Sequence, residues 1–239
     1  FPKNNAIAGE GIANEGINST KLGLKGIPAL AEHIQISRDL FLLEYTGGKL
    51  HIPTITTSKS VALIKEAKKK GLQVTCSVAA HHLVLTDDEL HGFDSNFKTN
   101  PPLRTKDDIK ALQKGVKSGV IDIITSDHNP IDIEHKKVEF SEAKDGVIGL
   151  ETAFSAVNSV LTLEDFISCF TTKPKEIFGV KNHTITEGNI ADITLFNPEI
   201  TTIFTKSNIL STSKNSPFIN KKLKGEVYGI FSNNQLIKN

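Results

Sequence analysis

Asp127 and His128 directly follow a run of apolar and β-branched residues, VIDIITS at 120–126, which predicts a buried strand. A carboxylate at the end of a strand can bind a metal ion or accept a proton from water. The same side chain can instead cap the turn that precedes Pro130. Both interpretations stay open, and they make Asp127 a candidate catalytic base and a candidate metal ligand.

Two adjacent histidines, His81 and His82, follow another predicted strand, LQVTCSVAA at 72–80. Neighbouring side chains leave an extended backbone in different directions, so the two imidazoles are not expected to bind one ion. The zinc-binding spacings HxH and HExxH are absent from the sequence. We therefore expect supporting or surface roles for this pair.

The segment FDSNFKTNPPLR, at 93–104, follows the same strand and contains amides, Lys98 and Arg104. Asparagine side chains can hydrogen-bond the edge of an amide or imide, and an arginine can bind a carboxylate with two hydrogen bonds. These residue types are also common in simple loops, so this signal is weak on its own. The glycine-containing stretch GEGIANEG lacks a preceding strand and does not predict a dinucleotide site.

Strand and helix patterns alternate from residue 28 onward. Helices are predicted at 28–45, 58–71 (with Ser58 as its cap), 105–119 and 149–160, and strands at 49–55, 72–80 and 120–126. This order predicts a parallel sheet covered by helices, in either an open or a barrel form. The long segments after the strands lie where barrel enzymes place their chemistry.

The pattern changes after residue 180, where short strands are separated by polar turns without intervening helices. The stretches EGNIADITLFNPE, TTIFT and KGEVYGIFSNNQ carry this signal. We predict a barrel portion over 1–182 and a small β-module over 183–239.

The composition is that of an ordinary soluble globular protein, with 38% hydrophobic and 23% charged residues and a net charge of +1. So small a charge gives no long-range attraction to nucleic acid or an anionic membrane, and no apolar run is long enough to span a bilayer.

Cys76 and Cys169 are too few for a disulfide framework and predict two buried thiols. No signal-peptide pattern is present, and we expect a cytoplasmic protein. Because the sequence starts at Phe1 and contains no Met, we treat the chain as part of a longer one.

Several motifs run in order along the chain: NEGINSTKLGLKGIPALAEHIQISRDL, EYTGGKLHI, HHLVLTDDEL, FDSNFKTNPPLRTKDD, TSDHNPID, GLETAF and SKNSPF. Together they resemble the dihydroorotases of the cyclic amidohydrolase superfamily. The resemblance implies a TIM-like (β/α)8 barrel, of which this chain covers the later part, with an appended β-module. It also implies zinc as cofactor and the interconversion of carbamoyl-aspartate and dihydroorotate in pyrimidine biosynthesis.

The resemblance also sets out which positions should bind metal and substrate. Phe1 and Thr54 stand where the family has metal-binding histidines, and Ile131 stands where it has a substrate-contacting histidine. Asp127 is retained as the catalytic base and metal ligand, and Asn100 is retained at a substrate-contact position. We therefore expect zinc to be absent or weakly bound and catalysis to be impaired or lost.

Three functions follow as alternatives. The first is a structural or regulatory protein that assembles with aspartate carbamoyltransferase, as the resemblance implies, or with itself as a homodimer. The second is an active cyclic amidohydrolase with a rearranged metal site that uses Asp127 with His81, His82 or His128. The third, motivated by Asn100, is a module that binds dihydroorotate or carbamoyl-aspartate without turnover.

Overall fold

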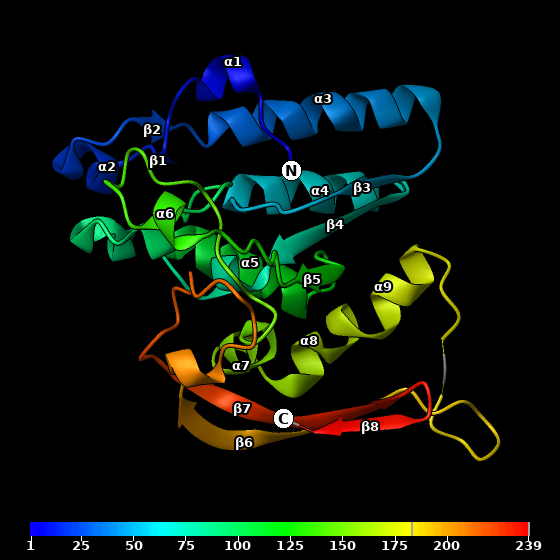
Figure 1. Ribbon diagram of the computed structural model, residues 1–239. Coiled ribbons are helices and arrows are strands. Elements are labelled where there is room, and N and C mark those ends of the chain that lie inside the picture. Colours follow the sequence, from blue (N-terminus) through cyan, green and yellow to red (C-terminus); the bar gives the residue numbers. More distant parts are fainter. Residues whose placement is uncertain (183, 239) are drawn as a thin grey trace.

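A computed structural model describes residues 1–182 and 184–238 (Figure 1). Its central sheet has the strand order β3-β4-β5, with β3 (Leu50–Ile52), β4 (Val74–Ala79) and β5 (Ile123–Thr125) all parallel. Each strand is joined to the next by a helix, which is the connection that parallel neighbours require. The predicted strands at 49–55, 72–80 and 120–126 are therefore confirmed, although each is shorter than its sequence pattern.

Three long helices pack on this sheet: α3 (Leu30–Thr46), α4 (Ser58–Lys69) and α5 (Lys106–Lys117). Their buried apolar side chains join those of the strands in the main core. Gly47 ends α3 with a positive φ of 72°, as its place after the apolar pattern predicts. These helices confirm the predictions at 28–45, 58–71 and 105–119.

The predicted cap of α4 is one residue out of place. The cap is Thr57, whose extended backbone lets its hydroxyl accept a hydrogen bond from the backbone N–H of Ser60 at 3.2 Å. Ser58 already has a helical conformation and forms the first turn, so its side chain does not cap the helix.

The described residues do not form a closed barrel, and the resemblance implied that this chain covers only the later part of one. The strands β1 (Ala13–Asn14) and β2 (Gly26–Ile27) pair with each other in parallel, separately from the sheet of β3, β4 and β5. A (β/α)8 barrel closes only when eight parallel strands complete the ring. The chain thus supplies an open arc of an α/β fold.

The predicted helix at 149–160 is shorter in the structure, where α7 spans Ala153–Asn158. Gly149 lies so close to the end of β5 that a Cβ atom on it would clash with the carbonyl oxygen of Ser126. The backbone N–H groups of Gly149 and Leu150 both donate to the His128 side chain. Residues 149–152 therefore form a turn fastened to β5, and the helix begins after it.

The remaining helical elements are short. They are α1 (Asn5–Ala8), α2 (Ile17–Leu22), α6 (Ile133–Lys136), α8 (Leu163–Phe170), α9 (Thr172–Ile177) and the 3-10 turns η1 (Ala80–Leu83), η2 (Asp87–Gly92), η3 (Ser95–Phe97) and η4 (Lys206–Asn208). In the part of the chain that the structure describes, no helix is both long and apolar enough to cross a bilayer.

The C-terminal strands form a separate antiparallel sheet with the order β6-β7-β8, drawn at the bottom of Figure 1. Its strands are β6 (Ile193–Ile203), β7 (Lys222–Ser232) and β8 (Gln235–Lys238). The stretches EGNIADITLFNPE and TTIFT, which were predicted as separate strands, both contribute to the single strand β6. The register between β6 and β7 shifts between Asn197 and Thr201. The predicted module 183–239 begins and ends at residues outside the described ones, and its boundary stays a prediction.

A second hydrophobic cluster joins this sheet to the rest of the chain. Phe204, Phe218 and Leu223 of the C-terminal segment pack with Leu103 and Ile148 from the segments that follow β4 and β5. The C-terminal residues therefore share a core with the segments that lie beyond the strand ends.

Both cysteines are buried and free, as the sequence predicts. Burial raises the pKa of the Cys76 thiol to about 12, which keeps it protonated.

Candidate functional site

The carboxyl ends of the three central strands bring Thr54, His81 and Asp127 to one edge of the sheet. Thr54 and Asp127 both have left-handed backbones, with φ of 50° and 45°. This conformation is strained for residues other than glycine, most of all for a β-branched threonine, and such strain is concentrated at functional sites. The Thr54 N–H donates to the Ser77 hydroxyl of β4 at 3.1 Å, which helps to hold the turn in place.

His81 approaches Asp127, with 3.9 Å between its Nε2 atom and a carboxylate oxygen. Burial lowers the pKa of His81 well below its ordinary value, and neighbouring His82 adds to this effect. The imidazole is therefore neutral at pH 7, so this approach is not an ion pair, and it is too long for a hydrogen bond. The structure brings these two predicted residues together without a direct bond.

Asp127 is half-buried, and burial raises the pKa of its carboxyl group. A hydrogen bond from the Asn129 side chain to the Asp127 carboxylate opposes this rise. We call the edge of the sheet formed by Thr54, His81 and Asp127 the mouth. The place of Phe1 at this mouth stays a prediction from the resemblance.

His82 and Asn100 lie beside this mouth. The Nε2 atom of His82 is 3.2 Å from the carbonyl oxygen of Pro101, and burial lowers the pKa of His82 to about 4. Among the described residues, the Nε2 atom of His81 and the Oδ1 atom of Asn100 are buried and have no hydrogen-bond partner. A buried polar atom left without a partner costs about 1–3 kcal/mol, so both atoms are suited to contact a bound molecule.

The His128 side chain forms hydrogen bonds with the backbone of the turn that precedes α7. Its Nδ1 atom accepts hydrogen bonds from the N–H groups of Gly149 at 3.2 Å and Leu150 at 3.3 Å. An Nδ1 atom that accepts these bonds has no lone pair left for a metal ion.

Arg104 is buried and bonded to other groups of the protein, whereas the sequence had left open that it could bind a carboxylate of a ligand. Its guanidinium donates to the Asn14 side chain at 2.7 Å, to the carbonyl of Ile27 at 3.2 Å and to the Thr56 hydroxyl at 3.1 Å. Buried Glu32 lies 3.8 Å from the same group. Arg104 therefore ties the segments around β1, β2 and β3 together.

Lys98 likewise has a structural role. Its ammonium group donates to the backbone carbonyls of Ser141 at 2.9 Å and Ala143 at 2.6 Å. Lys136 does the same for the carbonyls of Lys144 and Gly146. The two lysines hold the segment 141–146. Its residues 143–146, AKDG, are those that the resemblance aligns with the family's substrate-capping loop.

Asn215 is a residue of the mouth to which the sequence assigned no role. Its Oδ1 atom accepts from the N–H of Ile131 at 3.2 Å, and its Nδ2 atom donates to the carbonyls of Asn129 at 2.9 Å and Gly146 at 3.0 Å. The side chain is buried and joins the loop after Asp127 to the capping loop. Its motif, SKNSPF, is the signal that could have identified it.

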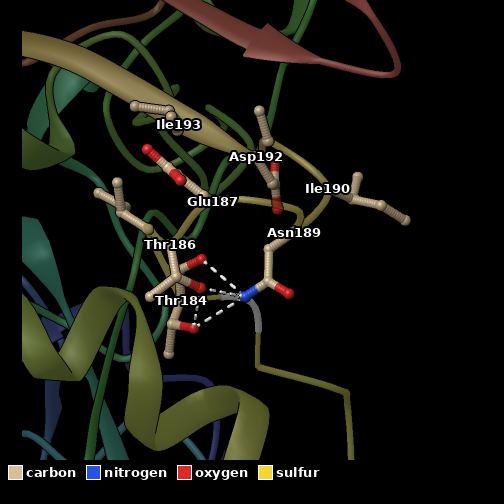
Figure 2. Close-up of a pocket in the computed structure, with 9 residues that line it drawn as sticks. Thr184, Thr186, Glu187, Asn189, Ile190, Asp192 and Ile193 are labelled. Carbon is tan, nitrogen blue, oxygen red and sulfur yellow. Dashed lines mark hydrogen bonds between the residues drawn. The ribbon is translucent and has the colours of Figure 1, made fainter.

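A separate hollow of about 260 Å³ lies in the loop before β6 (Figure 2). There the exposed Asn189 side chain donates to the Thr184 carbonyl and to the hydroxyls of Thr184 and Thr186. None of the residues that line it is a predicted site residue, so this hollow is distinct from the mouth at Asp127.

The chain belongs to the amidohydrolase family, whose sequence model matches residues 26–236. Within that family it is dihydroorotase-like, since it is 43% identical to the dihydroorotase of Trichlorobacter lovleyi over 224 residues. That alignment covers 92% of this chain and 53% of the relative, so the chain spans about half the length of the curated relatives it matches.

Solved structures show the same fold. The L-hydantoinase (dihydropyrimidinase) of Arthrobacter aurescens has a TM-score of 0.83 and 26% identity, covering 90% of this chain and 50% of its own. The inactive dihydroorotase-like domain of the Chaetomium thermophilum CAD-like multifunctional protein has a TM-score of 0.60 and 22% identity, covering 84% of this chain and 55% of its own. These likenesses confirm an α/β amidohydrolase fold, represented here by half of the full length.

Zinc, the cofactor of the family, does not fit the side chains of this chain alone. A catalytic zinc ion takes about three protein ligands and a water molecule. Within residues 1–182 and 184–238, no group of three or more His, Cys, Asp or Glu side chains could hold a metal ion. Asp127 and His81 form only a pair, so any full site would need ligands from beyond these residues.

Proposed function

We propose that the full protein is a dihydroorotase-family protein whose catalysis is impaired or lost and whose role is structural or regulatory. The resemblance puts Phe1 and Thr54 at positions where the family has metal-binding histidines. One observation supports the proposal: no group of three possible ligands surrounds Asp127 in the described part of the chain.

The chemistry of the replacements supports it. A phenyl ring has no lone pair for a metal ion, a neutral hydroxyl is a poor zinc ligand, and the side chain of Ile131 cannot form a hydrogen bond. The Chaetomium domain, described as inactive, has the same fold, so retention of this fold does not by itself require catalysis.

A second function has one favourable observation. The buried Nε2 atom of His81 has no hydrogen-bond partner among the described residues and lies 3.9 Å from Asp127, so the two side chains could hold a displaced metal ion with ligands from elsewhere. The protein would then be an active cyclic amidohydrolase acting on dihydroorotate or a similar cyclic amide.

Zinc content and turnover of purified full-length protein separate the two functions. We expect less than one zinc per chain by elemental analysis after growth with zinc, and no dihydroorotate hydrolysis above background. Stoichiometric zinc with turnover that Asp127→Ala abolishes would establish the second function and refute the first.

A gain-of-ligand variant sharpens the test. Replacing Phe1 and Thr54 together by histidine should raise the bound zinc, whereas the exposed Leu210→His change, a matched control, should not. Equal zinc in the double variant and the control would contradict the assignment of these two positions.

The regulatory role has its own test. We propose aspartate carbamoyltransferase as the partner, and co-sedimentation of the two purified full-length proteins would detect the complex. Independent sedimentation of both proteins at micromolar concentrations would count against this partner.

A further inference from the structure

The carboxylate of Glu32 is buried between α3 and α4, which lie next to each other in Figure 1. Glu32 is 2% exposed, and its Oε1 atom accepts hydrogen bonds from the backbone N–H groups of Thr56 and Thr57 at 2.9 and 3.2 Å. The hydroxyl groups of Thr56, Thr57 and Ser60 also donate to this carboxylate. These donors all come from the residues where the turn after β3 passes into α4.

This end of α4 is suited to hold a negative charge. Thr57 caps the helix and Ser60 lies in its first turn, so free backbone N–H groups and the helix dipole both favour an anion there. A buried charge is costly unless it is hydrogen-bonded, and Glu32 finds its bonds at this helix start. The carboxylate therefore ties α3 to the turn after β3.

Arg104 holds the same turn from a second direction. The Thr56 hydroxyl donates to the Oε2 atom of Glu32 and accepts from the Nε atom of Arg104 at 3.1 Å. The Nη2 atom of Arg104 lies 3.8 Å from the same Oε2 atom. Thr56 is thus fixed between a carboxylate from α3 and a guanidinium from the segment that follows β4.

The turn held in this way contains the strained residue of the mouth. Thr54, with its left-handed φ of 50°, precedes Thr56 by two residues. Such strain persists only where the surrounding structure fixes the backbone. The N–H groups of Thr54 and Ile55 bond to Ser77 of β4 at 3.1 and 2.9 Å, which fixes one end of the turn. The Glu32 network fixes the other end.

We propose that Glu32 is a positioning residue of the mouth, whose carboxylate holds the turn 53–57 in the strained conformation that directs residue 54. A buried network of directed hydrogen bonds adds little net stability over well-packed apolar side chains, but it can fix one geometry. Residue 54 matters to the mouth because the proposed function, on which this proposal rests, places a lost metal ligand there. The network is made of side chains other than the replaced ones, so it would keep the turn in place without a metal ion.

Hydrogen exchange of the full-length protein tests the effect on the turn. Glu32→Gln places an NH2 group where a carboxylate oxygen accepts, so donors from Thr56 or Arg104 lose their partner. We expect the amides of Thr54 and Thr56 to exchange at least roughly 10-fold faster, relative to the amides of β4, in this variant.

Two controls separate this local effect from a loss of overall stability. Glu66→Gln makes the same chemical change on the outer side of α4, where Glu66 and Lys69 form an ion pair with side chains 64% and 61% exposed, and should change nothing. Phe166→Leu, in the buried core on α8, should not change the ratio between the turn and β4. Should Glu32→Gln fail to fold, Thr56→Val keeps both charges, removes the hydroxyl between them, and should give the same local pattern.

Zinc affinity provides a measurement that a purely structural role would not change. The Phe1→His and Thr54→His double variant serves as the background, and zinc binding is measured by competition with a coloured chelator. Adding Glu32→Gln should weaken zinc binding by about 10–100-fold, as expected when the support of a ligand is removed. Adding Phe166→Leu should leave the affinity unchanged.

Two results would overturn the proposal: turn amides that keep their ratio to β4 in the Glu32 or Thr56 variant, or a zinc affinity that Glu32→Gln leaves unchanged. A double-histidine variant that binds no more zinc than Leu210→His would instead refute the assigned metal positions. The exchange ratio alone would then decide whether Glu32 holds the turn.

Discussion

Replacing Asn215 by alanine should destabilise the protein by about 3 kcal/mol, because three hydrogen bonds of a buried side chain are lost together. The side chain accepts from Ile131 and donates to Asn129 and Gly146, over 2.9 to 3.2 Å. Each such bond contributes about 1 kcal/mol net, and the buried backbone groups left behind add to the loss.

The matched control is Asn189, whose amide also makes three hydrogen bonds but is exposed. Water can replace those partners, so Asn189→Ala should change the free energy of unfolding by less than about 0.5 kcal/mol. Urea unfolding of full-length wild-type protein and both variants gives the two differences.

Hydrogen exchange adds a local measurement. The Ile131 amide, which donates directly to Asn215, should exchange faster in Asn215→Ala while the amides of β4 should keep their protection. Equal destabilisation by the two substitutions, or an unchanged Ile131 amide, would refute the reasoning that Asn215 fastens the mouth.

Three further predictions concern buried or strained residues. Arg104→Met should lower the free energy of unfolding by about 3 kcal/mol in urea titrations, because it leaves the buried Glu32 carboxylate without its cation. Thr54→Asn should raise the free energy of unfolding by up to about 1 kcal/mol, since asparagine tolerates the φ of 50° better than threonine does. Burial lowers the pKa of Lys136 to about 8, so the unfolded chain binds more protons than the folded one above that pH, and stability should rise between pH 8 and 10. That rise should be smaller in Lys136→Met, and an identical pH dependence of unfolding in both proteins would contradict it.

Local patterns were sufficient to predict the central sheet and its helices. The buried β-branched runs of β4 and β5 and the apolar spacing of α3, α4 and α5 each contain their own signal. Because a helix lies between successive strands, the order then favours a parallel sheet. The cap of α4 was misplaced by one residue because threonine and serine are both good caps, and only the backbone conformation decides between Thr57 and Ser58.

Long-range contacts explain what the sequence could not predict. Arg104 sits in a loop that can equally bind a ligand, and only the fold brings Asn14 and Glu32 to its guanidinium. The helix predicted at 149–160 lacks its first turn in the structure, because Gly149 contacts Ser126 and His128, which lie more than twenty residues earlier. The convergence of Asp127 and His81 was predicted in outline, because parallel strands end at one edge, but their spacing required the structure.

The link from Asn215 to Ile131 also bears on how the protein is made. The two residues are 84 positions apart in the chain, so at a synthesis rate of about 5–20 residues per second the ribosome delivers Asn215 roughly 4–17 seconds after Ile131. During that interval the nascent chain already contains Asp127 but lacks the side chain that anchors its loop. The loop after Asp127 should therefore be among the last parts to become ordered during translation.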